Sequence, residues 1–222
     1  MNNSVTNTAR LLGAGLRALL VLTVVCGVLY PLAVTGVAQG LFSGKANGSE
    51  ITADGKVVGS SLIGQAYNLP LKKGQETPEP DLKWFQGRPQ NGLGANSVNT
   101  RYKLILSGAT NRSGDNADLI TWVKDAKAAV VKDNSVTGYT VKPADVPAEA
   151  VTSSGSGLDP DISPDYADIQ VHRVAERNGL SVAQVRKLVD EHTDGRTLGF
   201  IGEPRVNVLE LNIALEGLVA KS

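Results

Sequence analysis

The stretch ALLVLTVVCGVLYPLAVTGVAQGLFS, from Ala18 to Ser43, decides the fold class because it runs for 26 residues without a charge. As a helix it would be about 39 Å long, whereas the hydrocarbon core of a bilayer is about 30 Å thick. Pro31 lies near its middle, but transmembrane helices accommodate the backbone groups that a proline frees. The stretch therefore predicts one transmembrane helix at residues 18–43.

The charges before this stretch predict its orientation. Arg10 and Arg17 precede it, and no carboxylate does. Positive charge close to a span favours the cytoplasmic side. We therefore expect a cytoplasmic N-terminus at residues 1–17 and an extracytoplasmic domain at residues 44–222.

A cleaved signal peptide is the alternative interpretation of the same segment. Gly36 and Ala38 are small residues placed as a cleavage site requires. The apolar part is much longer than the usual ~7–15 residues of a signal peptide, which favours a retained anchor in the membrane of the cell.

Charge in the rest of the chain argues against nucleic-acid binding. Lys and Arg together number 22, as do Asp and Glu, so without Arg10 and Arg17 the remainder is slightly acidic. A helical pair at residues 164–192 resembles a DNA-binding helix-turn-helix in spacing, but Arg173 and the other basic residues there are balanced by acidic ones. The only cysteine, Cys26, lies in the apolar stretch, so the outer domain has no disulfide.

Turn and capping residues predict the elements of the outer domain. Ile51–Val58 reads as a hairpin around Asp54-Gly55, residues 70–100 as an irregular stretch, and Ile105 as part of a short strand. A helix capped by Asp115 or Asn116 continues through DLITWVKDAKAAVVK.

Further patterns predict three more helices and one more strand toward the C-terminus. Ser163-Pro164 begins a helix that Asn178-Gly179 ends, and Ser181 with Gln184 has the spacing of a capping box. Thr197–Ile201 reads as a strand, and Asn207 with Glu210 opens a terminal helix. The chain is therefore expected to be an α+β extracytoplasmic domain attached to one N-terminal transmembrane helix.

No catalytic or metal-binding motif is recognisable. The sequence has no phosphate-binding loop, no nucleophile elbow and no Asp-Lys-Thr-Gly phosphorylation motif. His172 and His192 fall on different predicted helices without a cysteine nearby. We predict neither a catalytic residue nor a metal ligand.

Five segments resemble, in this order, signature segments of the C subunit of the bacterial Kdp potassium-transporting P-type ATPase. They are GSSLIGQ (59–65), WFQGRP (84–89), SGATN (107–111), VTSSGSGLDPDISP (151–164) and IGEPRVNVLELNIAL (201–215). The resemblance implies an accessory subunit that assembles and stabilises a potassium-importing, ATP-driven pump and influences how potassium or nucleotide is handled. Its partners would be a potassium-channel-like subunit, a P-type catalytic subunit that uses the ATP, and a small single-span subunit. The alternative function is a stand-alone membrane-anchored extracytoplasmic binding protein or hydrolase.

The resemblance also implies a nucleotide segment. Leu106–Thr110 is similar to the signature of ATP-binding-cassette proteins, although Ala109 and Thr110 depart from the usual Gly-Gln. The family-proposed residues are Ser107, Gly108, Thr110 and Asn111. The alternative is a strand that ends in a Ser-Gly turn, and the expected topology places this turn across the membrane from ATP.

Six residues are candidates for contact with partner subunits. Gly36 and Gly40 form a G-x-x-x-G pair that lets another transmembrane helix approach closely. Trp84, Phe85 and Arg88 are of the types enriched at interfaces, and equally of types that build a core. Asp159 is expected to form an Asx turn in the loop 151–164, which is either an internal scaffold or a contact surface.

Overall fold

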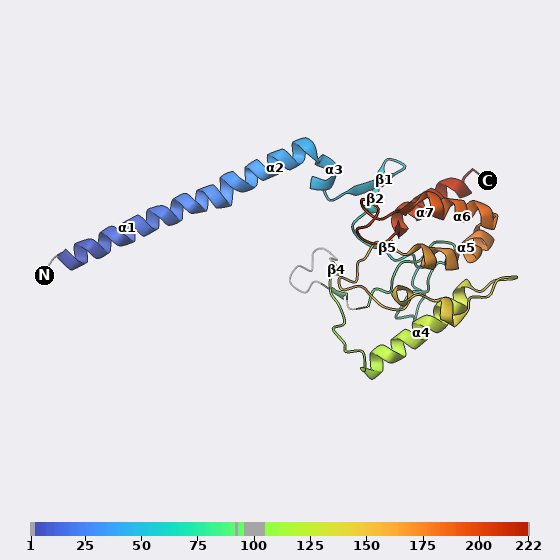
Figure 1. The fold of residues 1–222 in the computed structure, drawn as a ribbon. Coiled ribbons are helices and arrows are strands. Elements are labelled where there is room, and N and C mark those ends of the chain that lie inside the picture. The colour runs from blue at the N-terminus through green and yellow to red at the C-terminus, as the bar shows by residue number, and fades with distance from the viewer. Residues whose placement is uncertain (1–2, 92, 96–104, 222) are drawn as a thin grey trace. The chain divides into compact units, whose positions relative to one another are not determined.

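The computed structural model describes residues 3–91, 93–95 and 105–221 of the chain (Figure 1). The chain divides into two units, Met1–Glu50 and Ile51–Ser222. The first is helical and the second combines helices with small sheets, so the predicted α+β domain with one N-terminal apolar helix is confirmed.

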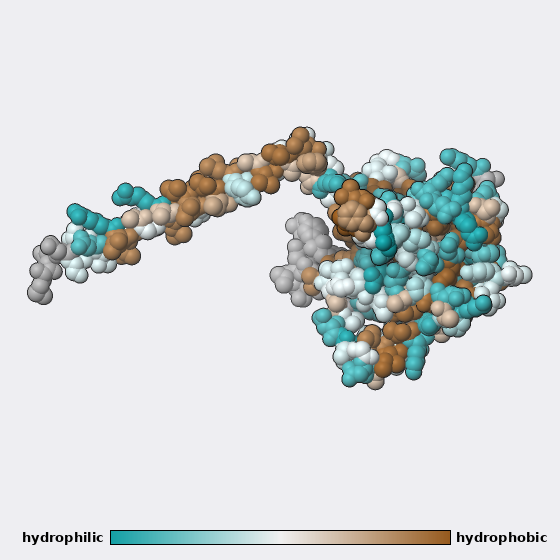
Figure 2. All heavy atoms as spheres, in the orientation of Figure 1, coloured by the Kyte–Doolittle hydropathy of each residue, from teal (hydrophilic) through white to brown (hydrophobic). Residues whose placement is uncertain are grey.

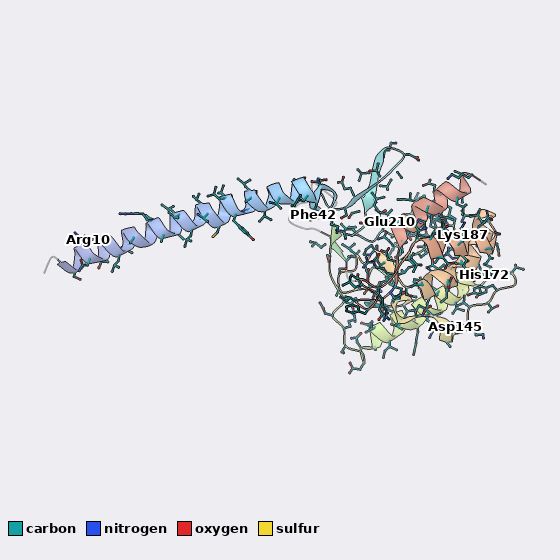
Figure 3. The ribbon with its side chains drawn as sticks, turned by 45° about the horizontal axis from the view of Figure 1, so that its top comes forward. Arg10, Phe42, Asp145, His172, Lys187 and Glu210 are labelled. Atoms are coloured by element: carbon teal, nitrogen blue, oxygen red, sulfur yellow. The ribbon has the colours of Figure 1, made fainter. Side chains whose placement is uncertain are left out.

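The first unit is built around one long helix. Helix α1 (Asn3–Val24) continues through a π-helical segment, η1 (Val25–Leu29), into α2 (Tyr30–Leu41). Ser4–Leu41 is 38 residues long and contains an 18-residue stretch with a mean hydropathy of 2.3, so it suits a single membrane span by length and composition. Arg10 and Phe42 lie near its opposite ends (Figure 3). Figure 2 shows hydrophilic residues near its start and hydrophobic residues along most of its length.

Pro31 is accommodated as expected, without ending the helix. The N–H of Tyr30 donates to the carbonyl oxygen of Val25, five residues earlier, in place of the usual four. The ring of a proline crowds the preceding turn of a helix, and a wider π-turn just before Pro31 relieves this crowding. A short helix, α3 (Ser43–Ala46), follows.

The α-helices among the described residues of the second unit are α4 (Ala117–Asn134), α5 (Pro164–Asn178), α6 (Val182–Glu191) and α7 (Val208–Val219). Their predicted N-caps are confirmed, because Asn116, Ser163, Ser181 and Asn207 each accept a backbone N–H. The capping box of Ser181 and Gln184 is present, and Gly179 ends α5 in a left-handed conformation. Helix α5 contacts α4 and α6, and α6 contacts α7 (Figure 1).

Three small sheets complete the second unit. Strands β1 (Glu50–Ala53) and β2 (Lys56–Ser60) flank Asp54-Gly55, which confirms the predicted hairpin. Strand β3 (Gly94–Ala95) pairs antiparallel with β4 (Ile105–Leu106). The third sheet has the order β5-β7-β6, formed by Asp161–Ile162, Arg205–Asn207 and Thr193–Asp194, with both pairs antiparallel.

The predicted strand at Thr197–Ile201 is wrong. These residues form a tight loop closed by a single bridge between Thr197 and Ile201. The strands of this region lie on either side of the loop, at β6 and β7, because only those residues find partners in the sheet.

The hydrophobic core lies between the helices and the third sheet. Two short 3-10 helices, η2 (Pro143–Asp145) and η3 (Ala148–Ala150), lead from α4 toward it. Its fully buried apolar side chains come from widely separated segments: Phe85, Ala167, Val171, Val174, Val185, Val206, Leu211 and Leu215. The core therefore ties the WFQGRP segment to α5, α6, β7 and α7.

Candidate functional site at the junction loop

The residues Ser156–Ile162, here called the junction loop, receive hydrogen bonds from three distant segments. The N–H of Gly108 donates to the carbonyl oxygen of Ser156 at 2.9 Å, and the N–H of Gly64 to that of Leu158 at 2.8 Å. The N–H of Val208 donates to the carbonyl oxygen of Pro160 at 3.0 Å. Segments that are far apart in the sequence therefore meet on the backbone of this loop.

Two glycines allow the close approach. A Cβ atom on Gly64 would lie 2.4 Å from the carbonyl oxygen of Asp159. Gly157 has a φ of +68°, and a Cβ there would lie 2.7 Å from the Leu93 side chain. Any larger residue at either position would push the segments apart, so glycine is required for packing as well as for conformation.

An ion pair joins the WFQGRP segment to the junction loop. Arg88 Nη1 lies 2.7 Å from Asp159 Oδ2, and the two side chains are 22% and 30% exposed. Asp159 Oδ1 also accepts the N–H of Asp161 at 3.1 Å, which confirms the predicted Asx turn. Two of the proposed partner-contact residues, Arg88 and Asp159, thus bind each other within the domain.

Asp161 connects the loop to the last signature segment. Its carboxylate lies 3.4 Å from Arg205 Nε and accepts from Asn207 Nδ2 at 3.2 Å. Partial burial raises the pKa of Asp161, while Arg205 opposes that rise. Asn207 Nδ2 also donates to the carbonyl oxygen of Ser61 at 2.9 Å, so this amide joins two signature segments.

The backbone of the WFQGRP segment is held by buried side-chain amides. Asn212 Oδ1 accepts the N–H of Phe85 and Asn212 Nδ2 donates to its carbonyl oxygen, both at 2.9 Å. Gln170 does the same for Gln86, at 2.7 and 3.0 Å. Two helices thus supply the hydrogen bonds that a neighbouring strand would otherwise provide.

Arg173 extends this network. It was counted among the balanced charges of the helical pair, and the structure shows that it is 1% exposed. Its guanidinium donates to the carbonyl oxygens of Leu82 and Trp84, to Asn134 Oδ1 and to Gln170 Oε1. Burial lowers the pKa of Arg173 to about 10, which still leaves the side chain charged at neutral pH.

The sequence analysis missed Asn134, Gln170 and Asn212, and it gave Arg173 no role in the core. A signal existed for Gln170 and Asn212. Asn212 lies one helical turn from Val208 and Leu215, and Gln170 one turn from Ala167 and Val174, which are all buried. A polar residue within an apolar helical stripe points to a buried hydrogen-bonding role.

The other predicted partner-contact residues differ in how deeply they are buried and in what surrounds them. Phe85 is fully buried, which favours the core interpretation of its side chain. Trp84 is half-buried, packs against Tyr67 with ring centroids 5.9 Å apart and lies under Lys83 Nζ. Gly36 and Gly40 lie on α2, where an added Cβ would meet no atom within 4 Å.

Ser107, Gly108 and Asn111 of the nucleotide segment donate hydrogen bonds within the domain. Ser107 Oγ donates to the carbonyl oxygen of Ser156 at 2.9 Å, the same oxygen that accepts from Gly108. Asn111 has a φ of 51° and its side chain donates to the carbonyl oxygen of Ala109, while Thr110 is half-buried. The strand β4 ends at Leu106 as the alternative expected, but residues 107–110 form no turn. Ser107 Oγ and the N–H of Gly108 instead share an acceptor in the junction loop.

A cavity of about 340 Å³ adjoins the WFQGRP segment. Arg88, Tyr166 and Arg173 line it together with apolar residues of α4. Burial raises the pKa of Tyr166 to about 12, so its hydroxyl stays protonated at neutral pH. Within residues 3–91, 93–95 and 105–221, no three His, Cys, Asp or Glu side chains are grouped as metal ligands.

Comparison with known proteins agrees with the resemblance carried by these segments. Residues 12–217 match the family model described as "K+-transporting ATPase, c chain". The chain is 87% identical to the potassium-transporting ATPase KdpC subunit of Streptomyces avermitilis over the full length of both chains. It is 79% identical to that of Streptomyces coelicolor over 99% of this chain and 98% of the relative, and 44% identical to that of Gemmatimonas aurantiaca over 93% and 94%. This chain therefore belongs to the family of c chains of K+-transporting ATPases.

Proposed function

We propose that this chain assembles and stabilises a potassium-importing P-type ATPase, acting as a rigid extracytoplasmic platform anchored by one span. The observation that carries this proposal is the junction loop, where all five signature segments meet and are joined by internal hydrogen bonds and ion pairs. Because the signature segments bind one another, they hold the second unit in one conformation. A subunit that assembles a complex needs such a conformation, because a pre-organised surface loses less conformational entropy on binding.

The membrane topology is part of the proposal. Arg10 and Arg17 favour a cytoplasmic N-terminus, and Ser4–Leu41 is long and apolar enough to cross the bilayer. Gly36 and Gly40 offer a face for a neighbouring transmembrane helix. On this arrangement the second unit lies outside the cytoplasm, and the chain shares the bilayer with its partners.

The proposed partners are a potassium-channel-like subunit, a P-type catalytic subunit and a small single-span subunit. ATP would be used by the catalytic subunit, and this chain would bind no nucleotide itself. Ser107 Oγ and the N–H of Gly108 both donate to the carbonyl oxygen of Ser156. This supports the absence of nucleotide binding, because a phosphate would have to compete with that carbonyl oxygen for both donors.

Expression of the other subunits of this ATPase with and without this chain tests the proposal. Each membrane preparation is solubilised in mild detergent, and the intact complex is measured by size-exclusion chromatography and by potassium-stimulated ATP hydrolysis. We expect at least a tenfold smaller yield of intact complex without the chain. Equal yield and activity in its absence would contradict an assembly role.

A further inference from the structure

Leu198, Phe200 and Ile201, here called the apolar tip, stand out among the described residues of the second unit. Their side chains are 79%, 72% and 51% exposed. Leu198 and Phe200 are the two most exposed large hydrophobic residues described in that unit, whereas Phe85 is completely buried. Figure 2 shows that hydrophobic residues on the visible face of the unit gather in separate patches.

The loop that carries the apolar tip is held in one shape. The N–H of Thr197 donates to the carbonyl oxygen of Ile201 at 2.9 Å, and the N–H of Ile201 donates to the carbonyl oxygen of Thr197 at 3.0 Å. Arg196 Nη2 and Glu203 Oε2 form an ion pair at 2.6 Å across the base of the loop. The apolar side chains are therefore presented by a closed loop with its own hydrogen bonds.

The same loop contains backbone strain that its own packing does not explain. Leu198 has a φ of 54°, in the left-handed region that residues other than glycine seldom occupy. Gly199 and Gly202, both at φ +81°, complete the turn. Strain in an exposed apolar residue points to a role in which its side chain is covered by something else.

The loop is joined directly to the buried core of the unit. It joins β6 to β7, and β7 leads directly into α7, where Leu211 and Leu215 are fully buried. Val206 in β7 is also fully buried. A partner bound at the apolar tip would thus be connected to the core and, through Val208 and Pro160, to the junction loop.

Charge around the apolar tip favours a protein over a lipid surface. The basic residues between β6 and α7 are Arg196, paired with Glu203, and Arg205, which lies within 3.5 Å of Asp194 and of Asp161. Anionic lipid headgroups attract basic segments, and this one has its basic side chains paired with carboxylates. The family to which the chain belongs consists of ATPase subunits, so a protein surface is available.

We propose that Leu198, Phe200 and Ile201 insert into an apolar pocket on another subunit of the same ATPase and serve as the outer domain's main anchor. This inference rests on the proposed assembly function. A few large side chains at the centre of an interface contribute most of its binding free energy, and a pre-formed loop places them without further ordering.

The double variant Leu198→Ser/Phe200→Ser tests the anchor in the full chain co-expressed with the other subunits. Because both side chains already face water, the variant should keep the wild-type thermal unfolding midpoint. We expect at least a tenfold loss of the other subunits recovered with the tagged chain. Leu71→Ser, at a residue that is 57% exposed and lies outside the loop, is the matched control and should recover them fully.

Undiminished recovery with the double variant would overturn the anchor while leaving the assembly function intact. Failure of the wild-type chain to recover any subunit would overturn both proposals. The conservative double variant Leu198→Met/Phe200→Leu should still associate with the other subunits, because it keeps the hydrophobic surface of the apolar tip. Loss of association in this pair equal to that in the serine variant would also contradict the proposal.

A second measurement identifies what covers the apolar tip. Ile201→Cys in a Cys26→Ala background is treated with a water-soluble maleimide in vesicles of phosphatidylethanolamine and phosphatidylglycerol. We expect rapid labelling when the chain is alone and at least tenfold slower labelling in the assembled complex. Rapid labelling in both states would overturn the proposal. Slow labelling of the chain alone would also overturn the proposal, because something other than a partner subunit would then cover the side chain at residue 201. Quenching of a fluorophore attached at residue 201 by brominated lipids would identify lipid as that cover. Absence of quenching would identify a second copy of the chain.

Discussion

The side-chain amide of Asn212 is hydrogen-bonded to both the N–H and the carbonyl oxygen of Phe85, a residue 127 positions earlier in the chain. Asn212 is 2% exposed and Phe85 fully buried, so water cannot replace either bond. The pair joins helix α7 to the WFQGRP segment, and together with Gln170 and Arg173 it provides hydrogen-bond partners for the backbone of Trp84, Phe85 and Gln86.

Asn212→Ala should strongly destabilise the second unit. The substitution leaves the backbone N–H and carbonyl oxygen of Phe85 buried without partners, and each such group costs about 1–3 kcal/mol. We expect a loss of about 3 kcal/mol in the free energy of unfolding, measured by urea titration of the detergent-solubilised chain. Asn91→Ala, at an exposed position, should change it by less than about 0.5 kcal/mol. Equal stability of the two variants would mean that the amide contributes nothing net.

Gly64→Ala should disturb the junction loop. The new Cβ would lie 2.4 Å from the carbonyl oxygen of Asp159, and backbone on both sides must move to relieve the overlap. Crowding of this kind costs about 1–3 kcal/mol. Gly195→Ala adds the same atom where nothing lies within 4 Å, and should be neutral in the same denaturation experiment. An unchanged free energy of unfolding for Gly64→Ala would show that the junction loop can move aside without cost.

Protonation of His172 should lower the stability of the second unit in mild acid. Its ring stacks on Tyr139, with centroids 3.9 Å apart and an angle of 4° between the planes. Burial, and secondarily Arg186, lower its pKa from the usual 6.5. The unfolded chain therefore binds the proton more readily, so this contribution to stability is complete above the unfolded pKa and is lost as the pH falls through the folded pKa.

The check is thermal unfolding of wild type and His172→Phe at about pH 7.5 and about pH 5, on either side of the histidine pKa. Phenylalanine keeps the stacking and cannot titrate. The wild-type midpoint should fall more on acidification than that of the variant. Equal falls would assign the acid sensitivity to other groups.

Ser107→Ala with Thr110→Ala should leave the apparent nucleotide affinity of the assembled pump nearly unchanged. Ser107 Oγ is already bonded to the carbonyl oxygen of Ser156, and on the proposed topology the segment lies across the membrane from ATP. The measurement is the ATP concentration for half-maximal hydrolysis. An increase of more than about tenfold, equal to ~1.4 kcal/mol, would instead support a nucleotide role.

Local signals in the sequence predicted the long helices and the hairpin at Asp54-Gly55. Ser163 accepts the N–H of Tyr166 at 3.2 Å, and Ser181 and Gln184 cap each other, as their spacing indicated. These features involve residues three apart, and short-range geometry alone decides them. The apolar N-terminal helix was equally predictable, because length and hydropathy suffice.

Long-range pairing was not predictable from the sequence. Arg173 looked like one surface charge among several, and only the approach of the Leu82–Trp84 backbone makes it a buried donor. Thr197–Ile201 has the composition of a strand, yet the residues on either side of it find sheet partners. The junction loop depends on contacts with residues as far away in the sequence as Gly64 is from Leu158 and Arg88 from Asp159. Local propensity carries no information about such long-range pairs.

If this chain is held in a potassium-transporting ATPase as an accessory subunit, the other subunits should be purified with it. Native mass spectrometry of the tagged chain, purified from membranes in mild detergent, measures this. We expect one dominant assembly whose mass equals this chain plus a channel-like subunit, a P-type catalytic subunit and a small single-span subunit. Recovery of the chain alone, or only with copies of itself, would contradict the accessory role.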